Sequence, residues 1–449
     1  PPFLFPQGPR GIAIDARQCA RRGDGQTVEC PGALRKGATG KPGVEVMQRD
    51  DLVIISTEDH LCEPSSLFDN QLCGGLLAAA PRRGVDTQGA PAWFYQDRAW
   101  PVAHCASFLA GGAGPETVAP VHLRSGCQDV HARIDEMDAN GVAASLCFGD
   151  ALRADSAIFH AAPDKVLALR HLRAVNDWHF DEWCMAYPGR LVPLGILPTW
   201  DVQASLAEID RLARKGLRVI ALGANPVLQG LPPIRDDRWL PIFRALADHD
   251  MTVACRPGAG QGAPGNAGAA GVDAWVATMP LATAQALADW LQLDALHACP
   301  ELRIVMPEGS IGWVSFLAAR ADLMDWRSPA GKESGRHDVM PSHLLARHFC
   351  HAFRWDPSGL ANWAEAGEDN IAFAAGYPRT MGPWADAAAQ CLEQLGEMPQ
   401  AVIDKVTHGN AIRWLRHEAL FEQFSRSEIT VGALRAQAAA KGVETALLD

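Results

Sequence analysis

A carboxylate and an imidazole stand two residues apart directly after an apolar run. Residues 52–60 read LVIISTEDH, which ends in Glu58-Asp59-His60. Residues at i and i+2 on a strand project from one face, so we expect Glu58 and His60 to lie side by side at the end of a first strand. Carboxylate oxygens and imidazole nitrogens both bind zinc. The pair therefore indicates a site for one divalent cation.

The chain after residue 51 alternates short apolar runs with amphipathic stretches. The apolar runs predict buried strands at 142–148, 191–197, 217–222, 251–255, 302–306 and 370–374. The amphipathic stretches predict helices at 130–140, 164–183, 202–215, 239–249 and 283–299. This alternation predicts an α/β fold with a parallel sheet covered on both faces. The number of units favours a distorted TIM-type (β/α)8 barrel over an open doubly wound sheet.

Three segments are predicted along the chain. Residues 1–50, rich in Gly, Pro, Arg and Lys, read as an N-terminal extension with little regular structure. Residues 51–416 read as the barrel, and residues 417–449 as a C-terminal helical tail. Residues 258–272 form a Gly/Ala-rich run after a strand, and they lack the glycine patterns of nucleotide-binding loops. We therefore expect a flexible connection there.

Composition excludes several classes of partner. The 449 residues carry 48% apolar content, enough for a large core, and a formal net charge of −12. Scattered cationic residues argue against nucleic-acid binding, and no apolar run reaches the ~18 residues of a membrane helix. Without a secretion-like N-terminus, a cytoplasmic location is expected. The twelve cysteines are spread singly, which favours reduced thiols, and Cys19 with Cys30 is the pair to check for a disulfide.

A set of short motifs makes the chain resemble the amidohydrolase superfamily, in the "amidohydrolase 2" branch related to aminocarboxymuconate-semialdehyde decarboxylase. The motifs are 56–64 (STEDHLCEP), 174–184 (AVNDWHFDEWC), 188–194 (PGRLVPL), 225–232 (NPVLQGLP), 308–313 (EGSIGW), 367–371 (GEDNI) and 407–411 (THGNA). The resemblance spans the predicted barrel. It implies a TIM barrel, commonly dimeric or larger, that binds Zn²⁺ or another divalent metal and runs hydrolysis or non-oxidative decarboxylation.

Some residues match the family's functional positions. The resemblance assigns Glu58 and His60 to the first-strand pair of metal ligands. It assigns Glu308 to a strand-end position that is Glu or a functional His in relatives, and this makes Glu308 the candidate catalytic residue.

Other positions depart from the pattern where the chemistry needs it most. Relatives usually carry a Glu, a metal-binding His, a metal-binding catalytic Asp and a His where this chain has, in that order, Ala224, Arg256, Gly376 and Arg379. An arginine cannot ligate, because its guanidinium stays protonated and offers no lone pair. A catalytic zinc needs three protein ligands, so Glu58 and His60 alone predict a poorly held metal. Cys255 is a rival ligand, although strand alternation sends it to the opposite face.

The arginines suggest a different use of the site. Arg256 supplies a permanent positive charge, and we expect it to form an ion pair with Glu58 in an emptied metal site. Arg379 adds a second cationic group on the same rim. The pocket is therefore predicted to bind a small anionic ligand.

Two functions remain open from the sequence. The first is a non-catalytic or regulatory subunit, with no cofactor, in a homo-oligomer or in a hetero-oligomer with an active amidohydrolase paralogue. The second is an active metal-dependent hydrolase or decarboxylase of small carboxylated or aromatic substrates. That enzyme would hold zinc or manganese with Glu58 and His60, and Glu308 would serve as a ligand or as an acid/base group.

Overall fold

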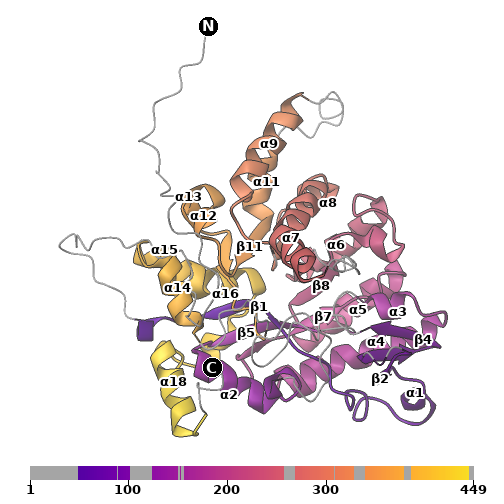
Figure 1. Ribbon diagram of the computed structural model, residues 1–449. Coiled ribbons are helices and arrows are strands. Elements are labelled where there is room, and N and C mark those ends of the chain that lie inside the picture. Colours follow the sequence, from indigo (N-terminus) through magenta and orange to yellow (C-terminus); the bar gives the residue numbers. More distant parts are fainter. Residues whose placement is uncertain are drawn as a thin grey trace. The chain divides into compact units, whose positions relative to one another are not determined.

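Parallel strands form two sheets that together close into a barrel (Figure 1). The computed structural model describes residues 49–87, 89, 91–101, 124–149, 152, 156–256, 268–307, 309–327, 339–378 and 386–443. One sheet has the order β1-β5-β6, and the other has the order β12-β11-β10-β9-β8-β7. The strands are β1 (Ile55–His60), β5 (Ala144–Phe148), β6 (Leu191–Val192), β7 (Leu194–Ile196), β8 (Val219–Gly223), β9 (Thr252–Arg256), β10 (Arg303–Met306), β11 (Phe349–Phe353) and β12 (Ile371–Phe373).

The two sheets meet at both of their edges. β6 and β7 are parts of one extended segment that is interrupted only at Pro193, which has no backbone N–H to give to a ladder. At the other edge the segment after β12 joins β1, because Gly376 N donates to Glu58 O at 2.9 Å and His60 N donates to Tyr377 O at 2.7 Å. The predicted TIM-type barrel is confirmed.

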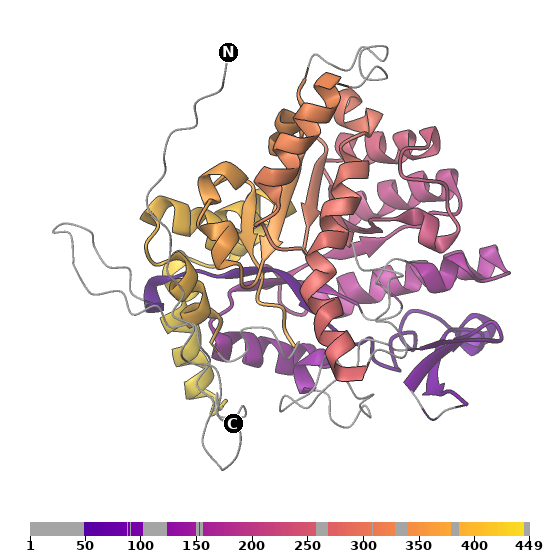
Figure 2. The same ribbon diagram turned by 45° about the horizontal axis from the view of Figure 1, so that its top comes forward.

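Helices surround the strands in both views (Figures 1 and 2). In chain order they are α1 (Gly74–Ala78), α2 (Val130–Asn140), α3 (Ala157–His160), α4 (Lys165–Trp178), α5 (Val202–Lys215), α6 (Leu240–Asp248), α7 (Gly268–Trp290), α8 (Asp294–Ala298), α9 (Val314–Arg327), α11 (Pro341–His348), α12 (Pro357–Leu360), α13 (Trp363–Ala366), α14 (Ala387–Leu395), α15 (Gln400–Asp404), α16 (Asn410–Leu415), α17 (Ala419–Gln423) and α18 (Val431–Ala440). Short 3-10 turns are η1 (Arg49–Asp51), η4 (Ser125–Cys127), η6 (Pro226–Gln229), η7 (Asp237–Trp239) and η10 (Arg426–Glu428), and π-helical turns are η5 (His179–Cys184) and η9 (Lys405–Gly409).

Capping residues set the ends of α2 and α5, whose bounds match the predicted helices. Asp129 caps α2 by accepting from two backbone N–H groups, and Asp201 caps α5 by accepting from Ala204 N. Both helices end at a glycine in the left-handed conformation, Gly141 at φ 72° and Gly216 at φ 100°. The predicted helix 164–183 is α4 followed by the π-helical turn η5.

Two predictions at the level of elements were wrong, and one barrel strand was missed. α7 already begins at Gly268, so residues 268–272 are helical and only the preceding part of the Gly/Ala run lies outside the described residues. The predicted helix 283–299 is split, because α7 ends at Trp290 and α8 follows separately. β11 was not predicted at all, since its sequence FCHAF is short and contains a histidine.

A small antiparallel sheet was also missed. It consists of β2 (Arg82–Val85), β3 (Pro91–Tyr95) and β4 (Arg98–Pro101). The β3–β4 turn is Gln96-Asp97, and both residues have positive φ, 46° and 65°. Such two-residue turns usually carry Asn-Gly or Asp-Gly, and this one lacks the glycine that would have indicated a hairpin.

The C-terminal tail packs on the barrel. α18 lies beside α2 (Figure 1), and Val431 N donates to Leu52 O at 2.8 Å in front of β1. α16 contacts the beginnings of strands, where Thr252 Oγ1 donates to Trp414 O at 2.5 Å. Residues 1–48 of the predicted extension, Cys19 and Cys30 among them, lie outside the described residues. Among the helices that are described, none combines the length and apolarity that crossing a membrane requires.

Candidate functional site

Glu58 and His60 meet at the carboxyl end of β1. The His60 ring Nε2 lies 3.0 Å from Glu58 Oε1, and both side chains are buried, at 2% and 1% exposure. β1 is irregular between Ser56 and Asp59 in its pairing with β5, yet the two side chains still share one side. The structure thus brings together the two residues that the sequence predicted as neighbours.

Arg354, which follows β11, holds the Glu58 carboxylate. Arg354 Nη2 lies 2.8 Å from Glu58 Oε1, and its Nε lies 3.4 Å from Glu58 Oε2. A guanidinium that presents two N–H groups to one carboxylate matches its planar geometry. Glu58 thus forms an ion pair with Arg354, a residue to which the sequence had not pointed.

Gly376 leaves the space that Arg354 fills. A Cβ atom at residue 376 would lie 2.6 Å from both Cδ and Nε of Arg354, far inside van der Waals contact. The backbone there has φ +68°, a conformation that glycine adopts at no steric cost. The space of a side chain at residue 376 is thus occupied by the arginine that follows the neighbouring strand β11.

Arg256 lies close to the ring of Phe148. It is the last residue of β9, is 4% exposed, and its guanidinium carbon lies 5.3 Å from the centre of the Phe148 ring. Phe148 pairs with His60 across β5 and β1, and the two rings are 6.3 Å apart. Ala224 is buried after β8 and its carbonyl accepts from Trp290 Nε1 at 2.8 Å. Arg256 is thus linked to His60 through the ring of Phe148, which lies near both residues.

Asp59 was not considered as a site residue, and it fastens β1 to the final strand. Its Oδ1 accepts from Ser56 Oγ at 2.9 Å and from Tyr377 N at 2.8 Å, and its Oδ2 accepts from Ser145 Oγ. Burial raises the pKa of Asp59 to about 6, although the charge of Arg133 and these hydrogen bonds act in the opposite direction. The last-strand loop is thereby fixed next to Glu58.

The described residues at this position do not fit a divalent metal. A metal site needs several converging ligands, and within the described ranges no group of three His, Cys, Asp or Glu side chains could hold an ion. Glu58 and His60 contact each other, and the Arg354 guanidinium is seated on the same carboxylate. We therefore derive no reaction step through a metal.

Two predicted site residues, Glu308 and Arg379, lie outside the described residues. Their neighbours are described: Pro307 follows β10, and Pro378 follows Tyr377. Arg354 was missed because β11 was missed. A parallel strand recognised at 349–353 would have placed Arg354 at the carboxyl edge of the sheet, where barrel sites are built.

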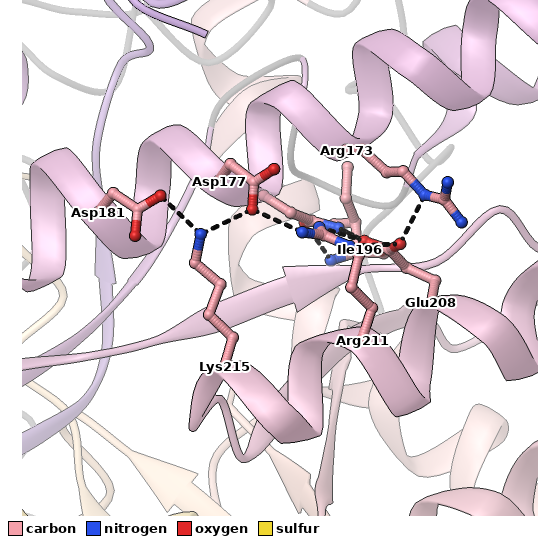
Figure 3. Close-up of polar contacts among 8 residues, drawn as sticks. Arg173, Asp177, Asp181, Ile196, Glu208, Arg211 and Lys215 are labelled. Carbon is pink, nitrogen blue, oxygen red and sulfur yellow. Dashed lines mark hydrogen bonds and ion pairs between the residues drawn. The ribbon is translucent and has the colours of Figure 1, made fainter.

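The Asn-Asp motif at 176–177 belongs to the fold and lies away from the site. Asn176 accepts from Ile196 N and donates to Ile196 O, so it ties α4 to β7. Its amide also donates to the fully buried Glu208 of α5 at 2.9 Å. Figure 3 shows the surrounding ion pairs between α4, η5 and α5, which are made by Arg173, Asp177, Asp181, Glu208, Arg211 and Lys215.

Comparisons with known proteins agree with this architecture. The family model described as "Amidohydrolase" matches residues 100–417, while a search of curated proteins gave no match. Similar solved structures include an amidohydrolase from Mycobacterium avium subsp. paratuberculosis K-10, with 19% identity and a TM-score of 0.61 over 81% of this chain and 99% of that chain. Another is 5-carboxyvanillate decarboxylase from Sphingomonas paucimobilis, with 19% identity and a TM-score of 0.55 over 81% and 99% of the two chains.

A third similar structure holds a metal. It is a dihydroxybenzoic acid decarboxylase from Polaromonas sp. JS666 with bound manganese and the inhibitor 2-nitroresorcinol, with 16% identity and a TM-score of 0.56 over 84% of this chain and 98% of that chain. At such identities the likeness establishes the fold and leaves the chemistry open. The family model, by contrast, matches more than half of the chain. This protein therefore belongs to the amidohydrolase family.

Proposed function

We propose that this chain is a non-catalytic member of the amidohydrolase family that binds a small carboxylate ligand with arginines in place of a metal. The observation that carries the proposal is the position of Arg354. Its side chain fills the space that a side chain at residue 376 would need, and it forms an ion pair with Glu58. A guanidinium delivers a permanent positive charge where relatives are expected to hold a cation. It neutralises Glu58 without activating a water molecule.

The charge around the site supports an anionic ligand. Arg354 is 21% exposed while Glu58 is 1% exposed, so the guanidinium lies between the buried carboxylate and solvent. Arg256 adds a second buried guanidinium, near Phe148. Planar guanidinium groups match the geometry of carboxylates. The ring of an aromatic acid could also pack against the ring of Phe148.

A subunit role is part of the proposal. α7 and α9 contact each other and carry exposed apolar side chains, namely Leu281 at 61%, Phe316 at 68% and Met324 at 55% exposure. Exposed apolar side chains on adjacent helices are typical of protein contact surfaces when they form one patch. We propose that the partner is a second copy of this chain or an active paralogue.

The proposal is tested on protein that is purified without chelators. We expect no stoichiometric metal by elemental analysis, a native mass above that of one chain, and thermal stabilisation by benzoate or a similar aromatic acid. That stabilisation should be lost in Arg354→Met and kept in Arg214→Met, which alters an exposed arginine of α5. A tightly bound stoichiometric zinc or manganese would overturn the proposal, and so would benzoate stabilisation that survives in Arg354→Met.

A second candidate is an active metal-dependent hydrolase or decarboxylase. The contact between Glu58 and His60 at the end of β1 favours it, because a carboxylate and an imidazole remain together where a first ligand pair belongs. In that case Arg354 must swing away from Glu58 when a metal enters. Adding Zn²⁺ or Mn²⁺ would then stabilise the protein, and Glu58→Gln and His60→Gln would each abolish this effect.

A further inference from the structure

Two cysteine thiols meet just beyond the end of β1. Cys62 stands two residues after His60, and Cys127 is the last residue of η4, in front of α2. Cys62 N donates to Cys127 O at 2.8 Å, and both residues have 0% exposure. With standard backbone bond lengths, this hydrogen bond keeps the two Cα atoms within about 7 Å. Disulfides bridge Cα distances of about 4.4–6.8 Å, so the spacing is compatible with a bond.

The surroundings of Cys127 favour its thiolate. A hydrogen bond from the Cys62 thiol lowers the pKa of Cys127, and the charge of Arg133 adds to this effect, against the influence of burial. Arg133 is fully buried, donates through Nε to Gly126 O at 2.8 Å, and lies 3.8 Å over the ring of Tyr377. The hydroxyl of Tyr377 lies 3.9 Å from Cys127 Sγ.

Other core cysteines have a different environment. Burial raises the pKa of Cys391 to about 12, and it also raises the pKa values of Cys255 and Cys350. Thiols of this kind are poor nucleophiles, because the thiolate is the reactive form. Cys127 therefore differs from them in having both a cationic neighbour and a second thiol beside it.

We propose that Cys62 and Cys127 form a redox-active pair that closes to a disulfide when a hydroperoxide oxidises it. The Cys127 thiolate attacks hydrogen peroxide, which breaks the O–O bond and gives a sulfenic acid and, after protonation, water. The Cys62 thiol then attacks that sulfur, and the hydroxyl leaves as a second water. One peroxide is reduced, two thiols are oxidised, and a dithiol reductant reverses the change.

Access to the buried pair comes through a short segment. η4 has three residues, its Ser125 is exposed, and Arg124 before it is partly exposed. Brief local opening of such a turn costs less than global unfolding and admits a small oxidant. A closed bond would tie the end of β1 to the start of α2. It would act next to Arg133, which also donates to His60 O.

The test uses the full chain, reduced and then freed of reductant, at neutral pH. A small excess of hydrogen peroxide is added, free thiols are alkylated, and peptides are mapped without reduction. We expect a linked peptide that joins Cys62 to Cys127, loss of two alkylated thiols, and recovery of both with dithiothreitol. The circular dichroism spectrum should stay native throughout.

Variants separate this pair from general oxidation. Cys62→Ser and Cys127→Ser should abolish the linked peptide, while Cys391→Ser should leave it unchanged. Separate alkylation of Cys62 and Cys127 after peroxide would overturn the proposal, as would a Cys127–Cys147 link or a bond that forms only in urea. Should a serine variant fail to fold, the peptide map of the unaltered protein decides the question alone.

Discussion

The guanidinium of Arg354 occupies the space that any side chain at residue 376 would need, and there it grips Glu58 at 2.8 Å. The two residues with which it interacts come from opposite ends of the chain, β1 and the loop after β12. A buried carboxylate is costly to leave without a counter-charge. Arg354 supplies that charge from the next strand, and the absence of a Cβ at Gly376 is the condition for it.

Removing Arg354 should destabilise the fold. Arg354→Ala leaves the Glu58 charge buried, and we expect a loss of about 3 kcal/mol in the free energy of unfolding. Urea denaturation measures it. The matched control is Arg214→Ala, whose partner Asp210 is exposed, and its effect should stay within about 0.5 kcal/mol. Equal losses in both variants would contradict the assignment, and Glu58→Gln added to Arg354→Ala should restore most of the stability.

Gly376→Asp should be poorly tolerated while Arg354 is present. The new Cβ would clash with Arg354 and the backbone has φ +68°, so a loss of about 1–3 kcal/mol is expected. In the exchange variant Arg354→Gly/Gly376→Asp the clash is gone and a second carboxylate joins Glu58 and His60. We expect this variant, unlike the single one, to gain zinc-dependent thermal stability. No response to zinc in the exchange variant would speak against residue 376 lying at the cation position.

His351 should make stability fall in mild acid. Both ring nitrogens lack a hydrogen-bond partner in the described part of the chain, and burial lowers the pKa of His351 to about 3. The unfolded chain, with a histidine pKa of about 6.5, binds the proton more readily, so stability is lost as the pH falls from about 6.5 toward 3. Between pH 7.5 and 5.0 this group alone accounts for about 2 kcal/mol.

His351→Leu removes that titration. Urea denaturation at pH 7.5 and pH 5.0 should therefore show a smaller loss in the variant than in the unaltered protein, by about 2 kcal/mol. Other buried histidines, such as His408 with a pKa lowered to about 4, titrate in both proteins and cancel in this difference. An identical pH dependence in the two proteins would show that folding does not lower the pKa of His351.

Glu208→Gln should weaken the junction between α4 and α5. Glu208 is fully buried and accepts from Arg173 at 2.9 Å and from Arg211 at 2.7 Å. Without its charge Arg173 loses this partner and Arg211 keeps Asp177, and we expect a loss of about 3 kcal/mol by urea denaturation. Asp210→Asn, two residues away on α5 at an exposed pair, should cost less than about 0.5 kcal/mol. Similar costs for the two variants would disprove a special role for Glu208.

The parts of the fold that depend on residues close together in the sequence were predicted correctly. α2 and α5 have the predicted bounds because an aspartate begins each helix and a glycine in the left-handed conformation ends it. The contact between Glu58 and His60 followed from the two-residue period of a strand. These features depend on residues that are close together in the sequence, so they can be predicted from one sequence alone.

The contacts of Arg354 with Glu58 and Gly376 join residues far apart in the sequence, so they could not be predicted in the same way. The sequence predicted an arginine next to Glu58 and named Arg256, and it did not point to Arg354, because strand β11 was not recognised. The fit between Arg354 and Gly376 joins residues 22 positions apart that follow two different strands, β11 and β12. Only the packed barrel reveals that the Arg354 side chain fills the space left by the absent side chain of Gly376.

The barrel is closed by main-chain hydrogen bonds, Gly376 N to Glu58 O and His60 N to Tyr377 O. Such bonds do not depend on which side chains the residues carry. Side chains at this seam can therefore be exchanged while the donors and acceptors that close the barrel stay in place. One barrel architecture can in this way present different chemical groups at the same place.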